Sequence, residues 1–116
     1  MAAVPYITNT ERSRVKTTTW TALTATNDSG QPEHSLDDFA DKTIQVKGTF
    51  NGATVNIQGS NDGGTTYWAL HDLQGDEIAI TTAGGTLIAE NPALIRPFTS
   101  GGGGSQSLTV ILVSRK

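Results

Sequence analysis

Hydrophobic and polar residues alternate along two neighbouring segments, residues 43–50 and 53–60, and this pattern predicts two β-strands. Successive side chains of a strand point to opposite faces, so residues of one parity share a face. The apolar positions fall on one such face: Ile44, Val46, Phe50, Val55 and Ile57. We therefore expect these side chains to form one layer of a hydrophobic core, with Thr, Gln, Lys and Asn on the other face.

The two segments are joined by Asn51-Gly52, a pair that suits the positive backbone angles of a two-residue type I′ turn. If Phe50 faces Ala53 across this turn, then Val46 faces Ile57, and every apolar pair lies on the same side. The agreement between turn and alternation predicts an antiparallel hairpin.

Two further strands are predicted at the ends of the chain. Residues 16–26 are rich in Thr and contain Trp20 and Leu23, which differ in parity and so indicate a bulge. Residues 107–114 are apolar at nearly every position, which is expected of a strand covered on both faces. We expect this last strand to be central.

Three weaker segments lie between them. Residues 65–71 form a short predicted strand in which Trp68 and Leu70 share parity, and this favours a core position for Trp68 over an exposed one. Residues 77–82 alternate until a glycine pair breaks the run. Residues 86–98 include two prolines, which cannot donate to a central ladder and predict an edge strand or a crossing segment.

Six to eight strands spaced about ten residues apart are typical of an all-β, single-domain β-sandwich with jelly-roll or Greek-key-like connections, and a barrel is the main rival. The 18 Thr and 13 Gly among 116 residues agree with strands joined by glycine turns. Residues 1–14 show neither helical nor alternating periodicity. We expect an extended N-terminal arm over residues 1–14 and one β-sandwich domain over residues 15–116.

Charge and cysteine content narrow the classes of function. A net charge of -3 with eight Lys and Arg makes nucleic-acid binding a poor expectation, because phosphate recognition needs clustered cations. The chain has no cysteine, and therefore neither a disulfide framework nor a thiolate zinc site. Its first residues lack an apolar signal segment and no later segment is long enough to span a membrane, so we expect a soluble protein without a membrane partner.

The sequence SNDGG at residues 60–64 has the residues of a calcium loop, a sugar-binding loop or a plain turn. Only Asp62 is acidic there and no terminal Glu follows, which excludes an EF-hand loop and favours a turn. His34 and His71 are the only histidines, the sequence contains no nucleophile-elbow motif, and the acids after His34 follow no metal-ligand spacing. We expect no catalytic residue, no cofactor, no metal and no small-molecule substrate, and hence no enzyme.

Several phrases of the chain resemble small structural proteins of tailed bacteriophages. They are QGSNDGG-TYW-L, ENP-LIRP and the glycine-rich loop before the last strand, and the resemblance covers residues 36–114. It implies a capsid decoration (cement) protein, often a homotrimer, made in the host cytoplasm and bound to the major capsid protein on the surface of the virion. A tail or head-tail structural protein and a carbohydrate-binding β-sandwich module are the alternatives.

The residues expected to contact the capsid lie mainly in the arm, whose apolar and cationic side chains suit an acidic shell: Pro5, Tyr6, Ile7, Arg12 and Arg14. A disordered terminus is the other interpretation of this segment. Arg96 is the sixth candidate, either paired with an acid across a subunit boundary or in an ordinary surface salt bridge.

Overall fold

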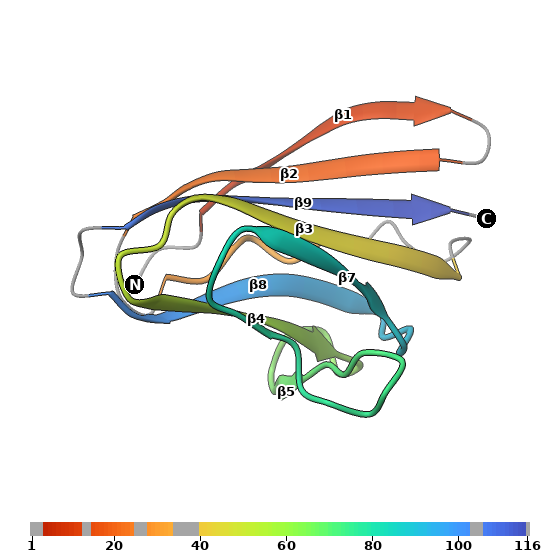
Figure 1. The fold of residues 1–116 in the computed structure, drawn as a ribbon. Coiled ribbons are helices and arrows are strands. Elements are labelled where there is room, and N and C mark those ends of the chain that lie inside the picture. The colour runs from red at the N-terminus through yellow and green to blue at the C-terminus, as the bar shows by residue number, and fades with distance from the viewer. Residues whose placement is uncertain (1–3, 13–14, 25–27, 34–39, 103–105, 116) are drawn as a thin grey trace.

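The computed structural model describes residues 4–12, 15–24, 28–33, 40–102 and 106–115, and shows an all-β sandwich of two antiparallel sheets (Figure 1). No helix occurs in these ranges, and none therefore has the length and apolarity to cross a membrane. The strands are β1 (Tyr6–Arg12), β2 (Val15–Leu23), β3 (Asp41–Thr49), β4 (Ala53–Ser60), β5 (Trp68–Ala69), β6 (Ala79–Ile80), β7 (Gly84–Ile88), β8 (Leu94–Gly101) and β9 (Ser107–Arg115).

The first sheet has five strands in the order β1-β2-β9-β3-β7, and the second has β4 between β8 on one side and β5 and β6 on the other. The prediction of a central last strand is confirmed, because β9 lies between β2 and β3. Only its inward residues are fully buried, however, and its outward residues are half-buried. The same alternation holds in β3, whose inward positions are buried and whose outward positions are exposed.

The turn between β3 and β4 has the predicted form, but the hairpin does not exist. Asn51 and Gly52 have φ angles of 50° and 88°, and the amide of Ala53 donates to the carbonyl of Phe50 at 2.9 Å. Instead of pairing, β3 and β4 belong to opposite sheets, and β3 pairs with β9 and β7. The backbone changes direction just before the turn, where Gly48 has a φ of 119°, an angle that a side chain disfavours.

The core lies between the sheets and contains the residues that the alternation predicted. Ile44 and Val46 from β3 and Val55 and Ile57 from β4 are at most 1% exposed, and Phe50 packs against them while half-buried. The residues of β3 and those of β4 therefore belong to facing sheets and are not cross-strand neighbours within one sheet. The bulge in β2 is confirmed by a register shift between Trp20 and Leu23, which places both side chains in the core.

Two segments differ from the sequence-based expectation. Tyr6–Arg12, expected to be part of an arm, forms β1 and pairs with β2, with a register shift between Thr8 and Glu11. The run of residues 77–82 ends before the glycine pair, as predicted, with β6 at Ala79–Ile80, but the pair also begins an unpredicted strand, β7, at the edge of the larger sheet opposite β1. Because glycine has no side chain, the first two residues of β7 add nothing to a pattern of apolar and polar positions, and the sequence carries no signal for a strand there.

Candidate functional site

The predicted contact residues of the N-terminal segment lie at one edge of the five-stranded sheet. Pro5 is exposed and precedes β1, and Tyr6, Ile7 and Arg12 lie within β1, opposite Trp20, Thr19 and Val15 of β2 in the ladder. Arg14 falls outside the described residues. The structure thus brings these candidates to a sheet edge rather than to a free arm, although it does not show what they contact.

Arg96, the sixth candidate, lies on the outer face of the second sheet. Its guanidinium carbon is 3.6 Å from the centroid of the Tyr67 ring, and its Nε donates to Gln58 Oε1 at 2.9 Å. Within the described ranges it forms no ion pair with a carboxylate. Stacking on an aromatic ring holds the guanidinium plane in place and leaves its outer nitrogens for a ligand or a partner.

Trp68 lies at the rim of the sandwich and is 37% exposed, so the prediction of a core position is wrong. Its indole Nε1 donates to Glu90 Oε2 at 3.2 Å, while the other oxygen of Glu90 accepts from the backbone amide of His71 at 2.6 Å and lies 3.1 Å from His71 Nδ1. Strand β5 is only two residues long, so parity with the buried Leu70 does not extend to Trp68.

The carboxyl group of Glu90 is the centre of this small network. Its partial burial opposes ionisation, but the hydrogen bonds from His71 and Trp68 outweigh burial and lower the pKa of Glu90. The ionised carboxylate fixes the indole in one orientation with part of its surface in solvent. An exposed, oriented indole beside a carboxylate and an imidazole has the parts of a saccharide-stacking site.

Residues 60–66 form the predicted turn. The carboxylate of Asp62 accepts from the amides of Thr65 and Thr66 and from the hydroxyls of Thr66 and Ser60, and these bonds lower its pKa far below the usual range. Its oxygens are thus engaged by the turn itself. The parts of the chain that the structure describes contain no group of three His, Asp or Glu side chains that could bind a metal.

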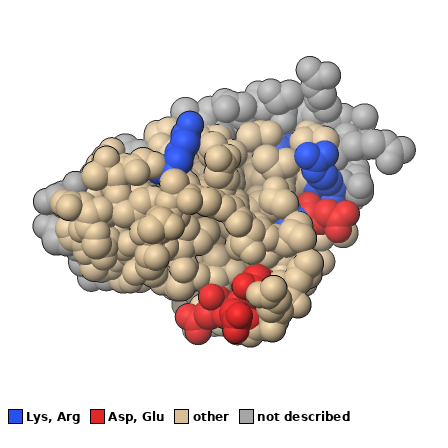
Figure 2. All heavy atoms as spheres, viewed as in Figure 1, with Lys and Arg blue, Asp and Glu red and all other residues tan. Residues whose placement is uncertain are grey.

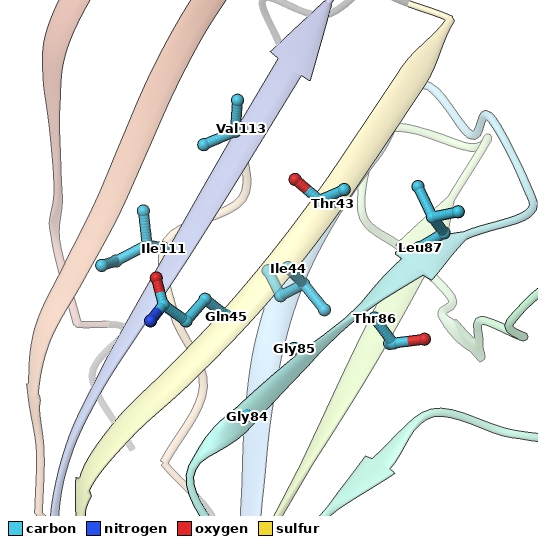
Figure 3. Close-up of a pocket in the computed structure, with 9 residues that line it drawn as sticks. All are labelled: Thr43, Ile44, Gln45, Gly84, Gly85, Thr86, Leu87, Ile111 and Val113. Carbon is cyan, nitrogen blue, oxygen red and sulfur yellow. The ribbon is translucent and has the colours of Figure 1, made fainter.

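The outer face of the five-stranded sheet is a surface that sequence reasoning missed. Strands β9, β3 and β7 line a shallow hollow of about 480 Å³ over Gly84 and Gly85, with Leu87 at its rim (Figure 3). In the view of Figure 2, charged atoms stand in separate groups with uncharged surface between them. The signal in the sequence was the apolar run itself, because Ile111 and Val113 are apolar although they point away from the core.

Comparisons with known proteins show likeness in fold only. No protein-family description matches the chain, and no curated protein matches its sequence. The solved structure of the SPBc2 prophage-derived protein YomS is similar with a TM-score of 0.62 and 14% identity, over 93% of this chain and 100% of that one. A recombinant oxalate oxidase in complex with glycolate matches with a TM-score of 0.41 and 15% identity, over 87% of this chain and 41% of that one.

Proposed function

We propose that this chain is a bacteriophage structural protein that binds the major capsid protein on the outer surface of the assembled head and stabilises it, without catalysing a reaction. Two independent likenesses support a phage protein. The phrases in residues 58–70 and 90–97 resemble capsid decoration proteins, and the prophage-derived YomS shares the fold over nearly the full length of both chains. Because one fold hosts many functions, the specific role is argued from the surface.

The observation that carries the proposal is the position of β1. The segment with the predicted contact residues is the end strand of the five-stranded sheet, and among the described residues only β2 pairs with it. An end strand offers backbone donors and acceptors to an extended segment of another protein, which can add to the sheet as a further strand. The register shift between Thr8 and Glu11 interrupts the ladder and restricts which segments fit.

Arg12 is the last residue of β1, and Arg14 follows two positions later in the sequence; two cations this close in the chain would favour an acidic capsid surface. Each bound copy would link neighbouring capsid subunits, and the binding free energy would add to the stability of the assembled shell. Many copies on one lattice make even weak individual contacts effective.

Cosedimentation with empty heads, taken from the phage or induced prophage whose genome encodes the chain, tests the role of these cations. The variant Arg12→Gln/Arg14→Gln should bind about tenfold more weakly, since two favourable rim charges are lost. The variant Thr65→Glu/Thr81→Glu lowers the net charge equally at exposed residues and should bind as the wild type does. Equal binding by both variants would contradict docking through this edge.

Electron cryomicroscopy of the same particles separates the head from the tail. A decoration protein should appear as repeated density over the capsid lattice, whereas density confined to the connector or the tail tube would favour the alternative structural role.

Saccharide binding is the second candidate function, and the exposure of Trp68 favours it. Trp20 is fully buried, so a change in indole fluorescence on adding a glycan would report on Trp68. Titration with cell-wall and capsular oligosaccharides should alter the emission of the wild type but not of Trp68→Phe. No change with any glycan would remove this candidate.

A further inference from the structure

The outer face of the five-stranded sheet carries two adjacent rows of uncharged residues. The ladder pairs Thr17 with Val113, Val113 with Thr43, and Thr43 with Leu87 in one row. The next row along the strands is Thr19, Ile111, Gln45 and Gly85. Four of these residues are polar Thr or Gln, but Leu87, Ile111 and Val113 are apolar and line one hollow. An exposed apolar patch is costly to leave in water, and such patches often mark contacts between proteins.

Charged residues bound these rows at the two ends of β3: Lys47 at one end, and Asp41 at the other, where the ladder pairs Asp41 with the exposed Arg115 of β9. Asp41 and Lys47 are both exposed and share the parity of the outward residues, and six residues of strand separate them by about 20 Å. Because they lie far apart along one strand, the two ends of the face differ in charge.

The edge of the face adds a matching protrusion and hollow. Leu87 is 44% exposed, and two residues away along β7 lies Gly85, which lines the hollow (Figure 3). A side chain cannot replace this glycine without a shift, because its Cβ would lie 2.7 Å from the carbonyl oxygen of Ile44. The hollow is therefore a fixed property of the sheet.

We infer that this face binds a second copy of the chain about a twofold axis that lies in the contact plane and runs across the strands. This rotation keeps each strand over its own counterpart and reverses its direction, so the two uncharged rows exchange places. Leu87 of one copy then faces the Gly85 hollow of the other, and Val113 faces Ile111. Asp41 of each copy faces Lys47 of the other, which makes the patch self-complementary in shape and in charge.

A twofold axis parallel to the strands is the competing arrangement. It would place Asp41 opposite Arg115 of the second copy, but it would bring Leu87 onto Thr17 and leave the hollow facing Thr19. Lys47 would then face Thr109 and not a carboxylate. The axis across the strands therefore gives both the apolar side chains and the charges of the face a matching partner. Two sheets can pack with their strands aligned to within about 30°, an angle that accommodates the twist of each sheet.

The size of the face sets the expected strength. Four strands at a spacing of about 4.8 Å and a length of about 20 Å give roughly 400 Å² of flat area per copy, against roughly 800 Å² per partner in a standard interface. The dimer should therefore be weak and concentration-dependent, with dissociation in the micromolar range. The proposal concerns the purified chain alone and does not depend on binding to heads.

Sedimentation equilibrium over a wide concentration range tests the dimer. The wild type should pass from monomer to dimer, and Leu87→Lys should raise the dissociation constant at least tenfold by placing an ammonium in the uncharged face. Thr65→Lys adds the same charge at an exposed residue between β4 and β5, strands of the second sheet, and should leave association unchanged. A wild type that stays monomeric at every concentration, or that forms trimers, would overturn the inference.

Exchanging the two charged residues, Asp41 and Lys47, tests the charge pairing separately. Lys47→Asp and Asp41→Lys should each weaken the dimer, because each places like charges opposite one another. The double variant Lys47→Asp/Asp41→Lys should restore association, with melting temperatures recorded to confirm that each variant is folded. A double variant as weak as the single ones would overturn the pairing.

The absence of cysteine in the chain allows the axis to be read by cross-linking. A mixture of Asp41→Cys and Lys47→Cys proteins, treated with a short bis-maleimide, should give a covalent dimer of one of each. Cross-linking of Lys47→Cys with itself at equal or higher yield would show the axis parallel to the strands and overturn the proposed one.

Discussion

The two ends of the sandwich interior are built in different ways. Near the β3–β4 turn the interior is apolar, with Val46, Val110 and Leu108 facing Ala53 and Val55. At the other end of the same sheet, the inward positions of β2, β9 and β3 are Lys16, Ser114 and Lys42, which form one row across three strands and are at most 4% exposed.

The polar end is organised around a buried carboxylate. Glu33 is fully buried, lies 3.4 Å from the ammonium of Lys16, and accepts a hydrogen bond from the hydroxyl of Thr18 at 2.8 Å. Lys42 donates to Asn91. The comparison shows that apolar contacts stabilise one end of the interior, whereas paired charges and hydrogen bonds stabilise the other. Apolar contacts tolerate gradual change, whereas buried charges are stable only together with their partners.

Removal of the buried carboxylate should give the largest effect. Glu33→Leu leaves the ammonium of Lys16 without this partner and should lower the free energy of unfolding by about 3–5 kcal/mol. The double variant Lys16→Met/Glu33→Leu removes both charges and should be less destabilised than the single variant. Urea unfolding measures both. The single variant Lys16→Met completes the set. If the double variant loses as much free energy of unfolding as the two single variants together, the pair is not coupled.

Truncation in the apolar end should have a somewhat smaller and graded effect. Ile57→Ala removes three buried carbons from a fully enclosed side chain and should cost about 3 kcal/mol, and Ile57→Val should cost about 1 kcal/mol. The same urea experiment, with unchanged slopes, checks this. Equal losses for both variants would mean that volume does not govern this end.

The stability of the polar end should also depend on alkaline pH. Burial lowers the pKa of Lys42 from 10.5, partly offset by the charge of Asp41. The unfolded chain therefore binds this proton more readily, so stability should fall as pH decreases from 10.5 towards the lowered pKa. Comparison of urea midpoints across this range in wild type and Lys42→Met isolates the contribution, since the variant should lose that slope.

The smallest effect is expected at Ser114. Among the described residues its buried hydroxyl oxygen has no hydrogen-bond partner, so Ser114→Ala removes a polar group that is buried at a cost. Stability should stay within about 0.5 kcal/mol of the wild type or rise. A loss above about 1 kcal/mol in urea unfolding would indicate a partner for this hydroxyl, such as an ordered water.

Alternation predicted which side chains point inward but not which strands pair. Ile44, Val46, Val55 and Ile57 are inward both in a hairpin and in a chain that crosses between sheets, because both arrangements bury the same parity. The chain passes from one sheet to the other between β3 and β4, and Gly48 near the end of β3 has a positive φ. A glycine inside a predicted strand was the one sign of this passage in the sequence.

The surfaces were harder to predict than the core. β1 has no periodic pattern because an edge strand is not required to bury a full face, so its sequence reads as an arm. Trp68 belongs to a strand too short for parity to fix its orientation. The outer face of β9 escaped notice because a run that is apolar at nearly every position fits burial on both sides as well as on one.

The place of β9 has a consequence for synthesis on the ribosome. Strand β9 follows β2 and β3 in the chain and fills the middle of the larger sheet, so β2 and β3 have no shared neighbour until β9 has left the exit tunnel. Until then the nascent chain must keep the apolar faces of β2 and β3 apart, and these faces are open to aggregation and to proteases. Loss of β9 should then divide the larger sheet into two unconnected pairs of strands, β1 with β2 and β3 with β7.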